Sequence, residues 1–267
     1  MIFRNGEFRA SGVLVSAVAF AVPLLIVAAA AMGQDAQQRR REPVDVTAYP
    51  WASIGKIGIS TVSVHTSCTG SVISPSEVLT AAHCLYIERT GRFISAEAIH
   101  FLLGYDKGEY RAHRIGSRYM TSPKYDPAKP EETAGDDWAV ITVESPFPPD
   151  TKPLRLADER PLPGAPVLTG GYPSEKAHMM TADKHCRVEA VSDDGKLISN
   201  TCIIHHGNSG GPLLSADKGA EGLIIGVITL GFSKIEELKD QSKEGGVAVA
   251  AWAIKQSLAS QGTVRPK

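Results

Sequence analysis

The sequence lacks an excess of charge of either sign. Its 28 lysines and arginines nearly balance its 29 aspartates and glutamates, giving a formal net charge of -1 and a pI near 6.7. Because nucleic acids and anionic membranes attract strongly basic proteins, neither partner is expected. Internal repeats and low-complexity segments are also missing. The composition is that of an ordinary globular protein.

Charge is absent from the long apolar run between Val13 and Met32. Arg4 and Arg9 precede this run, and small residues close it, which is the pattern of a secretory signal. The run is also long enough to span a bilayer. Residues 1–33 are therefore predicted to be a signal peptide or an N-terminal anchor. Both place the body of the protein outside the cytoplasm, secreted or periplasmic, with membrane contact only if the segment is retained.

One basic cluster, Arg39-Arg40-Arg41, follows this segment. Because polar residues surround it, it is interpreted as part of a solvated linker, with a processing site as the alternative. Residues 34–50 are thus expected to form a polar linker or a propeptide. Residues 51–267 are expected to form the folded domain, which is long enough for an ample core.

Closely spaced Cys-x-x-Cys pairs are absent too, although the chain has four cysteines. In an exported protein, four cysteines favour two disulfides. Their spacing favours the local pairs Cys68 with Cys84 and Cys186 with Cys202. Other pairings remain open. A metal site is a further alternative, because His185 and His205 lie near the second pair and could complete a set of nitrogen and sulfur ligands.

The apolar pattern predicts an all-β protein, with short runs separated by frequent turns. Residues 146–166 hold seven of the 17 prolines and are predicted to connect two halves. One helix is expected at 251–259. The predicted strands are 57–65, 69–73, 78–80, 99–103, 110–115 and 138–143 in the first half, and 167–170, 186–191, 197–204, 213–214, 223–230 and 247–250 in the second.

Ser209 lies between glycines in Gly207-Asn208-Ser209-Gly210-Gly211-Pro212, a setting that can expose a nucleophile and converge neighbouring amides on one point. No histidine follows it, since all eight precede Ser209. An α/β-hydrolase needs its catalytic histidine after the serine, so that class is excluded. The order that remains is histidine, aspartate, serine.

His83 is the candidate base, because it follows a short strand and two alanines that leave room beside the imidazole, and precedes a cysteine that could tether the turn. A core histidine bound to backbone groups is the alternative. Asp137, at the start of an apolar strand, is the candidate for the acid that orients the base. Asp136 is an alternative acid, and a turn-forming Asp-Asp pair would make neither residue functional.

Three motifs carry a resemblance to a known family: Thr80-Ala81-Ala82-His83-Cys84, Asp137-Trp138-Ala139-Val140 and Gly207-Asn208-Ser209-Gly210-Gly211-Pro212. Together they resemble the chymotrypsin-like (trypsin-like) serine endopeptidases, nearer the bacterial secreted branch, over roughly Trp51 to Ala259. The resemblance implies two six-stranded antiparallel β-barrels with the catalytic cleft between them. Barrel one would span about 51–145, a crossover 146–166, barrel two 167–250, and a C-terminal helix 251–259.

The resemblance also implies roles for single residues. His83 would be the base, Asp137 its orienting acid and Ser209 the nucleophile, with the amides of Gly207 and Ser209 as the oxyanion hole. The substrate pocket would include the following residues: Ile203, Ile204, His206, Thr229, Leu230 and Gly231. No cofactor and no metal is expected, and the partner would be a protein or peptide substrate.

The sequence departs from the family pattern at two positions. Zymogen-type members carry an aspartate just before the serine, where this chain has Asn208, so activity should not require one defined cleavage. Trypsin-like members carry an aspartate at the position of Ile203. An uncharged substrate side chain is therefore expected before the cleaved bond, because a buried cation would lose its hydration without gaining a partner. Recognition of glutamate by His205 or His206 is the alternative.

These features predict a secreted serine endopeptidase that works through an acyl-enzyme and is not trypsin-like in specificity. A catalytically silent family member acting as a binding module, and an esterase with the same triad, are the alternative functions.

Overall fold

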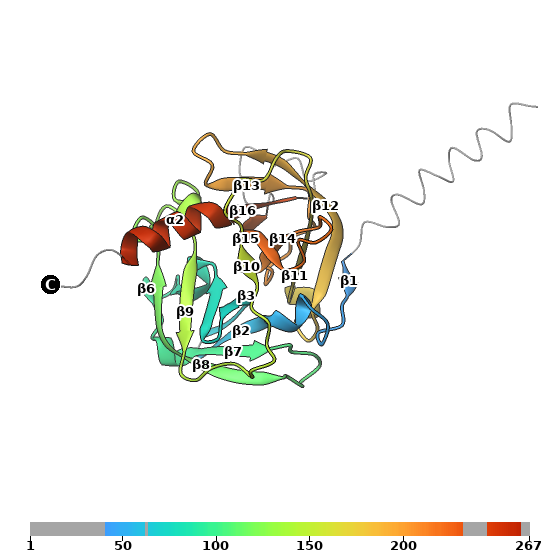
Figure 1. Cartoon of the computed structure of the whole chain (residues 1–267). Coiled ribbons are helices and arrows are strands. Elements are labelled where there is room, and N and C mark those ends of the chain that lie inside the picture. The colour runs from blue at the N-terminus through green and yellow to red at the C-terminus, as the bar shows by residue number, and fades with distance from the viewer. Residues whose placement is uncertain (1–40, 62–63, 232–244, 263–267) are drawn as a thin grey trace, which may run out of the picture. The chain divides into compact units, whose positions relative to one another are not determined.

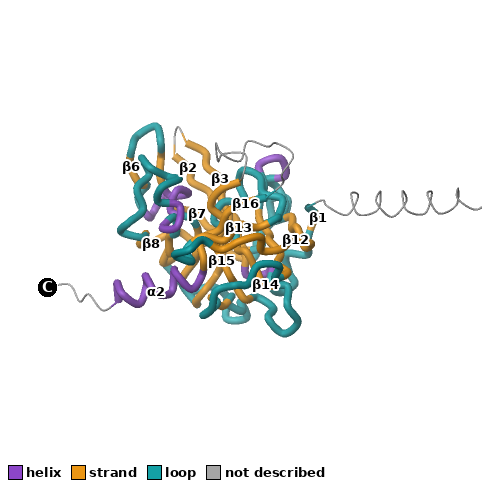
Figure 2. Tube along the Cα trace, turned by 90° about the horizontal axis from the view of Figure 1, so that it is seen from above, coloured by secondary structure: helices purple, strands orange, loops and turns teal. Residues whose placement is uncertain are grey.

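The computed structural model describes residues 41–61, 64–231 and 245–262. Within these ranges nearly all regular structure is β (Figures 1 and 2), with short 3-10 turns and one α-helix, α2 (Ala251–Gly262). Within the described residues no helix has the length and hydropathy needed to cross a membrane. The predicted signal or anchor, 1–33, and residues 34–40 lie outside the described residues.

The first barrel is a closed ring of six antiparallel strands. Around the ring they are β2 (Ile54–Thr61), β3 (Val64–Ser74), β4 (Glu77–Thr80), β9 (Ala139–Val143), β8 (Ala112–Thr121) and β7 (Ile99–Leu103). Buried and partly exposed residues alternate along β7, with Ile99, Phe101 and Leu103 facing the core. This period of two is what a sheet with one buried face requires.

The second barrel also closes with six strands, since β12 and β13 pair at the two ends of the sheet. In order they are β12 (Thr181–Val191), β11 (Pro166–Gly171), β14 (Pro212–Ser215), β15 (Leu223–Gly231), β16 (Gly246–Ala250) and β13 (Leu197–Asn200). Two short strands join this sheet, β1 (Glu42–Pro43) beside β12 and β10 (Arg155–Leu156) parallel to β15. A separate hairpin pairs β5 (Tyr86–Ile87) with β6 (Arg92–Phe93).

The 3-10 turns lie at the connections between strands. They are η1 (Trp51–Ser53), η2 (Ala82–Leu85), η3 (Ala96–Ala98), η4 (Ala134–Asp136) and η5 (Ser174–Lys176). The α2 helix follows β16 directly and packs against β15, β16 and β10 (Figure 1).

The predicted fold class, two six-stranded antiparallel barrels with a short C-terminal helix, is confirmed. Several predicted element boundaries are wrong. The strand expected at 57–65 is two strands, β2 and β3, and the strand expected at 197–204 ends at Asn200. Apolar residues continue to Ile204, but residues 201–209 form a loop in which the amides of Cys202, Ile203 and His205 bind side chains and not the backbone of a neighbouring strand.

Residues 41–50 include the short strand β1. Glu42 and Pro43 pair with Ala182 and Thr181 of β12, so the chain is already part of the second barrel's sheet before the first barrel begins.

Candidate active site

His83 and Asp137 lie together because the strands next to them are paired. His83 is in η2, directly after β4, and Asp137 comes just before β9, while Thr80 of β4 pairs with Ala139 of β9. The Nδ1 atom of His83 lies 2.6 Å from Oδ2 of Asp137. The His83 backbone amide also donates to Oδ1 of Asp137, at 2.8 Å. Both ring orientation and loop conformation therefore depend on one carboxylate.

A third donor to Asp137 comes from the second barrel. The hydroxyl of Thr229, in β15, donates to Oδ2 of Asp137. Asp137 is only 2% exposed. Burial by itself raises the pKa of Asp137, but the charge of His83 and the hydrogen bonds from His83 and Thr229 outweigh it and hold the pKa below its usual value. Asp137 is therefore ionised and can stabilise a histidine cation.

The side chain of Asp136 contacts Lys196 and Ser122. Its Oδ2 atom lies 2.7 Å from Nζ of Lys196, and its Oδ1 accepts a hydrogen bond from Ser122 at 2.9 Å. This carboxylate is bound to the second barrel and not to His83. The geometry therefore favours Asp137 over its neighbour as the partner of the histidine.

Ser209 lies on a turn that only glycine-rich sequence can form. Gly207 and Gly210 have φ values of 91° and 78°, in the left-handed region. A Cβ at Gly207 would collide with the carbonyl oxygen of Tyr172, and one at Gly210 with the hydroxyl of Thr80. Both glycines are therefore needed for the backbone on either side of the half-buried Ser209.

The amides around Ser209 divide into two sets. Those of Asn208, Gly210 and Gly211 donate to backbone carbonyls at 2.7–3.0 Å. In the described part of the chain, the amides of Gly207 and Ser209 have no such acceptor. These two amides are the ones predicted for the oxyanion hole, and donors without a partner are what that role requires.

Thr69, in β3 of the first barrel, fixes this turn. Its hydroxyl donates to the carbonyl of Gly207 at 2.8 Å, and its amide donates to the carbonyl of Ser209 at 2.9 Å. Sequence reasoning missed this residue as well as the bond from Thr229 to Asp137. The only sequence signal for Thr69 was its place directly after Cys68, in the stretch leading to the histidine.

The residues predicted for the substrate pocket lie on two segments. Ile203 and Ile204 are half-buried and His206 is exposed, all on the loop before Ser209. Leu230 and Gly231 end β15, where they pair with Val247 and Gly246 of β16.

A cavity of about 310 Å³ lies beside His83. Thr229, one of the residues predicted for the substrate pocket, lines this cavity. The full lining is His83, Tyr86, Glu88, Tyr125, Pro127, Pro130, Glu131, Asp137 and Thr229.

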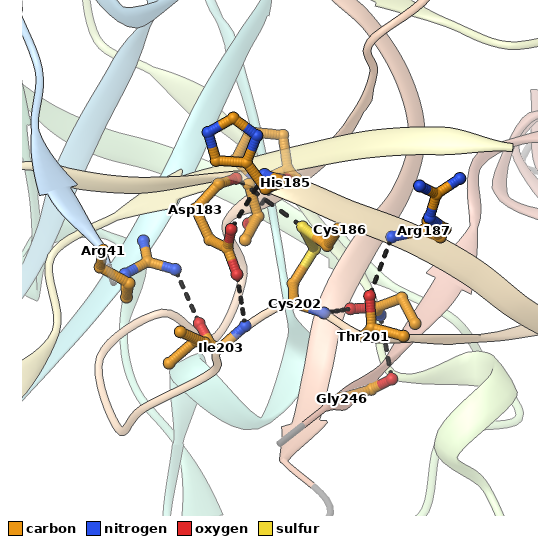
Figure 3. Close-up of a disulfide and its surroundings, with 12 residues drawn as sticks. Arg41, Asp183, His185, Cys186, Arg187, Thr201, Cys202, Ile203 and Gly246 are labelled. Atoms are coloured by element: carbon orange, nitrogen blue, oxygen red, sulfur yellow. Dashed lines mark hydrogen bonds between the residues drawn. A yellow bond between two sulfur atoms is a disulfide. The ribbon is translucent and has the colours of Figure 1, made fainter. Parts of the chain in front are cut away.

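The two predicted disulfides are confirmed, Cys68 with Cys84 and Cys186 with Cys202. The first ties β3 to the turn that carries His83, and the second ties β12 to the loop before Ser209 (Figure 3). The metal site considered for Cys186 and Cys202 is wrong, because sulfurs bonded to each other are not thiolate ligands.

The same argument applies to the first disulfide. Ligand atoms of Cys68, His83 and Cys84 lie within 4.8 Å of one another, but both sulfurs belong to the bridge.

Comparison with known sequences gives one family match and several relatives. The sequence model of the trypsin family matches residues 41–250. Trypsin epsilon of Drosophila erecta is 26% identical over 189 residues, covering 62% of this chain and 68% of the relative. Trypsin alpha of Drosophila melanogaster is 27% identical over 218 residues, covering 70% and 74%. The expected link to the bacterial branch is not confirmed by these matches.

Comparison with solved structures shows the same fold. A Glu endopeptidase in complex with MPD matches with a TM-score of 0.65 and 20% identity, covering 83% of this chain and 95% of the other. The thermostable serine protease AL20 from an extremophilic microorganism matches with a TM-score of 0.61 and 20% identity, covering 80% and 98%.

Proposed function

This chain belongs to the trypsin family and is a serine endopeptidase, and we propose that His83, Asp137 and Ser209 are its catalytic triad. The observation that carries this proposal is the pair formed by His83 and Asp137, with 2.6 Å between Nδ1 and Oδ2. In a triad the ring nitrogen that faces away from the carboxylate, here Nε2, takes the proton of the nucleophile.

The proposed reaction begins when Oγ of Ser209 attacks the carbonyl carbon of the peptide bond. His83 takes the serine proton on Nε2 and then gives it to the leaving amine, which breaks the C–N bond and leaves an acyl-enzyme. Water then attacks the carbonyl carbon of the acyl-enzyme, with His83 again as base. The ester bond to Ser209 breaks, the carboxylic acid product leaves, and His83 returns the proton to Ser209. Asp137 stays ionised and stabilises the histidine cation, while the amides of Gly207 and Ser209 bind the oxyanion.

We further propose an uncharged substrate side chain before the cleaved bond. Ile203 offers no carboxylate, and the carboxylate bound to its amide, that of Asp183, accepts hydrogen bonds from the amides of His185 and Ile203 at 3.0 and 2.9 Å. It is also attracted to the buried charge of Arg41. A substrate lysine or arginine would therefore gain no free anion from Ile203 or Asp183 to offset its lost hydration.

Glutamate is the second candidate, because the most similar fold reported above is that of a Glu endopeptidase. His205 could supply the cation, but its Nε2 lies 3.3 Å from Oε1 of Glu175. A substrate carboxylate would have to displace that residue. This competition favours the uncharged side chain over glutamate.

An extracytoplasmic location is part of the proposal. Two disulfides hold the loops of the site, and such bonds persist in oxidising compartments. N-terminal sequencing of the exported protein tests this location and locates the cleavage site; a mature chain that starts at Met1 in the cytoplasm would contradict it.

The test of the triad is Ser209→Ala, with Ser174→Ala as the matched control. Ser174 is exposed, and its amide binds the carbonyl of His206, on the same loop as Ser209. Loss of the nucleophile should lower kcat on the order of 10⁶-fold without lowering the melting temperature. A fluorophosphonate probe should label wild type and Ser174→Ala, but not Ser209→Ala. Full turnover in a folded Ser209→Ala protein would overturn the proposal, and absence of labelling in wild type would favour a silent binding module.

A further inference from the structure

Side chains hold several peptide groups of the loop before Ser209, in addition to its backbone contacts with Arg187, Ser174 and Thr69. At Ile203 both backbone groups are bound by charged residues (Figure 3). Its amide donates to Oδ2 of Asp183 at 2.9 Å, and its carbonyl accepts from Nη1 of Arg41 at 2.8 Å. Ile203 directly follows Cys202 of the second disulfide, at the start of the segment that leads to the nucleophile. Fixing it restricts the conformations open to the loop that carries Ser209.

Arg41 reaches this loop from the N-terminal end of the described chain. It directly precedes β1, which pairs with β12. Its Nε donates to the hydroxyl of Thr181 at 3.1 Å, and its Nη2 donates to the carbonyl of the same residue at 2.5 Å. The guanidinium thus bridges the β12 strand and the loop before Ser209, and it is only 8% exposed.

This burial is unfavourable for the fold. It lowers the pKa of Arg41 to about 10, against the opposing attraction of Asp183 and Glu175. The side chain is nevertheless charged near neutral pH. Because a buried ion commonly adds less stability than a well-packed apolar residue, stability alone does not account for an arginine here.

The residue before the nucleophile offers no ionic partner of its own. Asn208 is fully buried and neutral, and its Oδ1 accepts a hydrogen bond from the amide of His205 at 3.0 Å. That bond closes the turn within the loop but does not connect it to another element. The connection to the N-terminal segment is made by Arg41.

We propose that Arg41 is a positioning residue, whose guanidinium fixes Ile203 and so holds the loop of the oxyanion amides and Ser209 in its active arrangement. This inference rests on the proposed catalytic role of Ser209. If Arg41 has this role, activity depends on a residue that precedes the first barrel. Since Arg41 ends the triplet Arg39-Arg40-Arg41, cleavage after Arg40 keeps the guanidinium, whereas cleavage after Arg41 removes it and lowers activity.

The experiment uses point variants of the full exported chain. Arg41→Met removes the charge and all donors while keeping an unbranched side chain. Arg114→Met is the matched control, because the Arg114 guanidinium also binds backbone carbonyls, those of His113, Ser145 and Pro146, but in the first barrel. Each protein is measured for melting temperature, for kcat and KM on a library varied before the cleaved bond, and for the rate of fluorophosphonate labelling.

Arg41→Met should lower kcat/KM about 10- to 100-fold, the effect of losing hydrogen bonds from a charged group. The loss should fall mainly on kcat, be the same for every residue in the library, and slow fluorophosphonate labelling in proportion. Arg41→Lys, which keeps a cation and can bind one carbonyl, should restore part of the activity. Arg114→Met should leave kcat/KM unchanged, whatever its effect on the melting temperature.

Two results would overturn the proposal. One is a folded Arg41→Met protein with wild-type kcat/KM. The other is a loss confined to acidic substrates, which would make Arg41 a recognition residue and not a positioning one. If Arg41→Met does not fold, Arg41→Lys and Thr181→Val take its place, and wild-type kcat/KM in both would be decisive against it. Failure of the triad itself would appear separately, as full activity in Ser209→Ala.

Discussion

The hydroxyl of Thr229 donates a hydrogen bond to the carboxylate of Asp137, which joins β15 of the second barrel to the loop before β9 in the first. The same carboxylate binds both the ring and the backbone amide of His83. The position of the histidine therefore depends on contacts from both barrels.

Thr229→Val should lower kcat about 10- to 100-fold, because it removes one hydrogen bond to a buried charge while keeping the shape of the side chain. Steady-state kinetics and a melting curve measure the effect. Thr142→Val is the control, since its hydroxyl lies on β9 and accepts from Arg118 instead of contacting the site. Equal activity of both variants would show that Thr229 does not orient Asp137.

The free energy of unfolding should decrease at acid pH because Asp137 becomes protonated. Its pKa is lower in the folded chain than in the unfolded one, so the unfolded chain binds the proton more readily. The contribution is complete above about pH 5 and is lost as the pH falls through the folded pKa. Urea unfolding between pH 2 and 6 should show this slope in wild type and a smaller slope in Asp137→Asn, with exposed Asp158→Asn as control. Parallel curves for all three proteins would contradict the assignment.

Gly207→Ala should abolish most activity, with Gly219→Ala as the control. Both glycines have positive φ, 91° and 84°, so alanine at either position introduces a similar backbone strain of about 1 kcal/mol. At Gly219 a Cβ meets nothing within 4 Å, whereas at Gly207 it collides with the Tyr172 carbonyl. Only Gly207→Ala must therefore displace an oxyanion amide, which should cost about 10²- to 10³-fold in kcat. Similar kcat values for the two variants would remove Gly207 from the oxyanion hole.

Ile203→Asp should create a preference for arginine or lysine before the cleaved bond, while wild type prefers an uncharged residue. The new carboxylate would offset the hydration that a buried cation loses. Cleavage of a peptide library varied at that one position measures the change. A basic preference already present in wild type would refute the apolar pocket.

The sequence by itself predicted those parts of the candidate site that depend on neighbours along the chain. The glycines around Ser209 are needed for local backbone angles, and the alternation in β7 follows the pleat of a strand, so both can be recognised in short windows. The local disulfide pairs were also predictable, because each closes a loop with a separation of 16 residues. The short motifs around His83, Asp137 and Ser209, and their order in the chain, also indicated the family.

Only the tertiary structure decided which distant groups meet. Asp136 and Asp137 are adjacent in sequence, and their separate partners, Lys196 and His83, became visible once the barrels were closed. Contacts from Thr69, Thr229 and Arg41 to the site span 92 to 162 residues of chain. No short pattern encodes such pairs, because strand register and barrel closure bring them together. Local motifs thus indicated the proposed chemistry, and barrel closure determined which distant residues contact the candidate site.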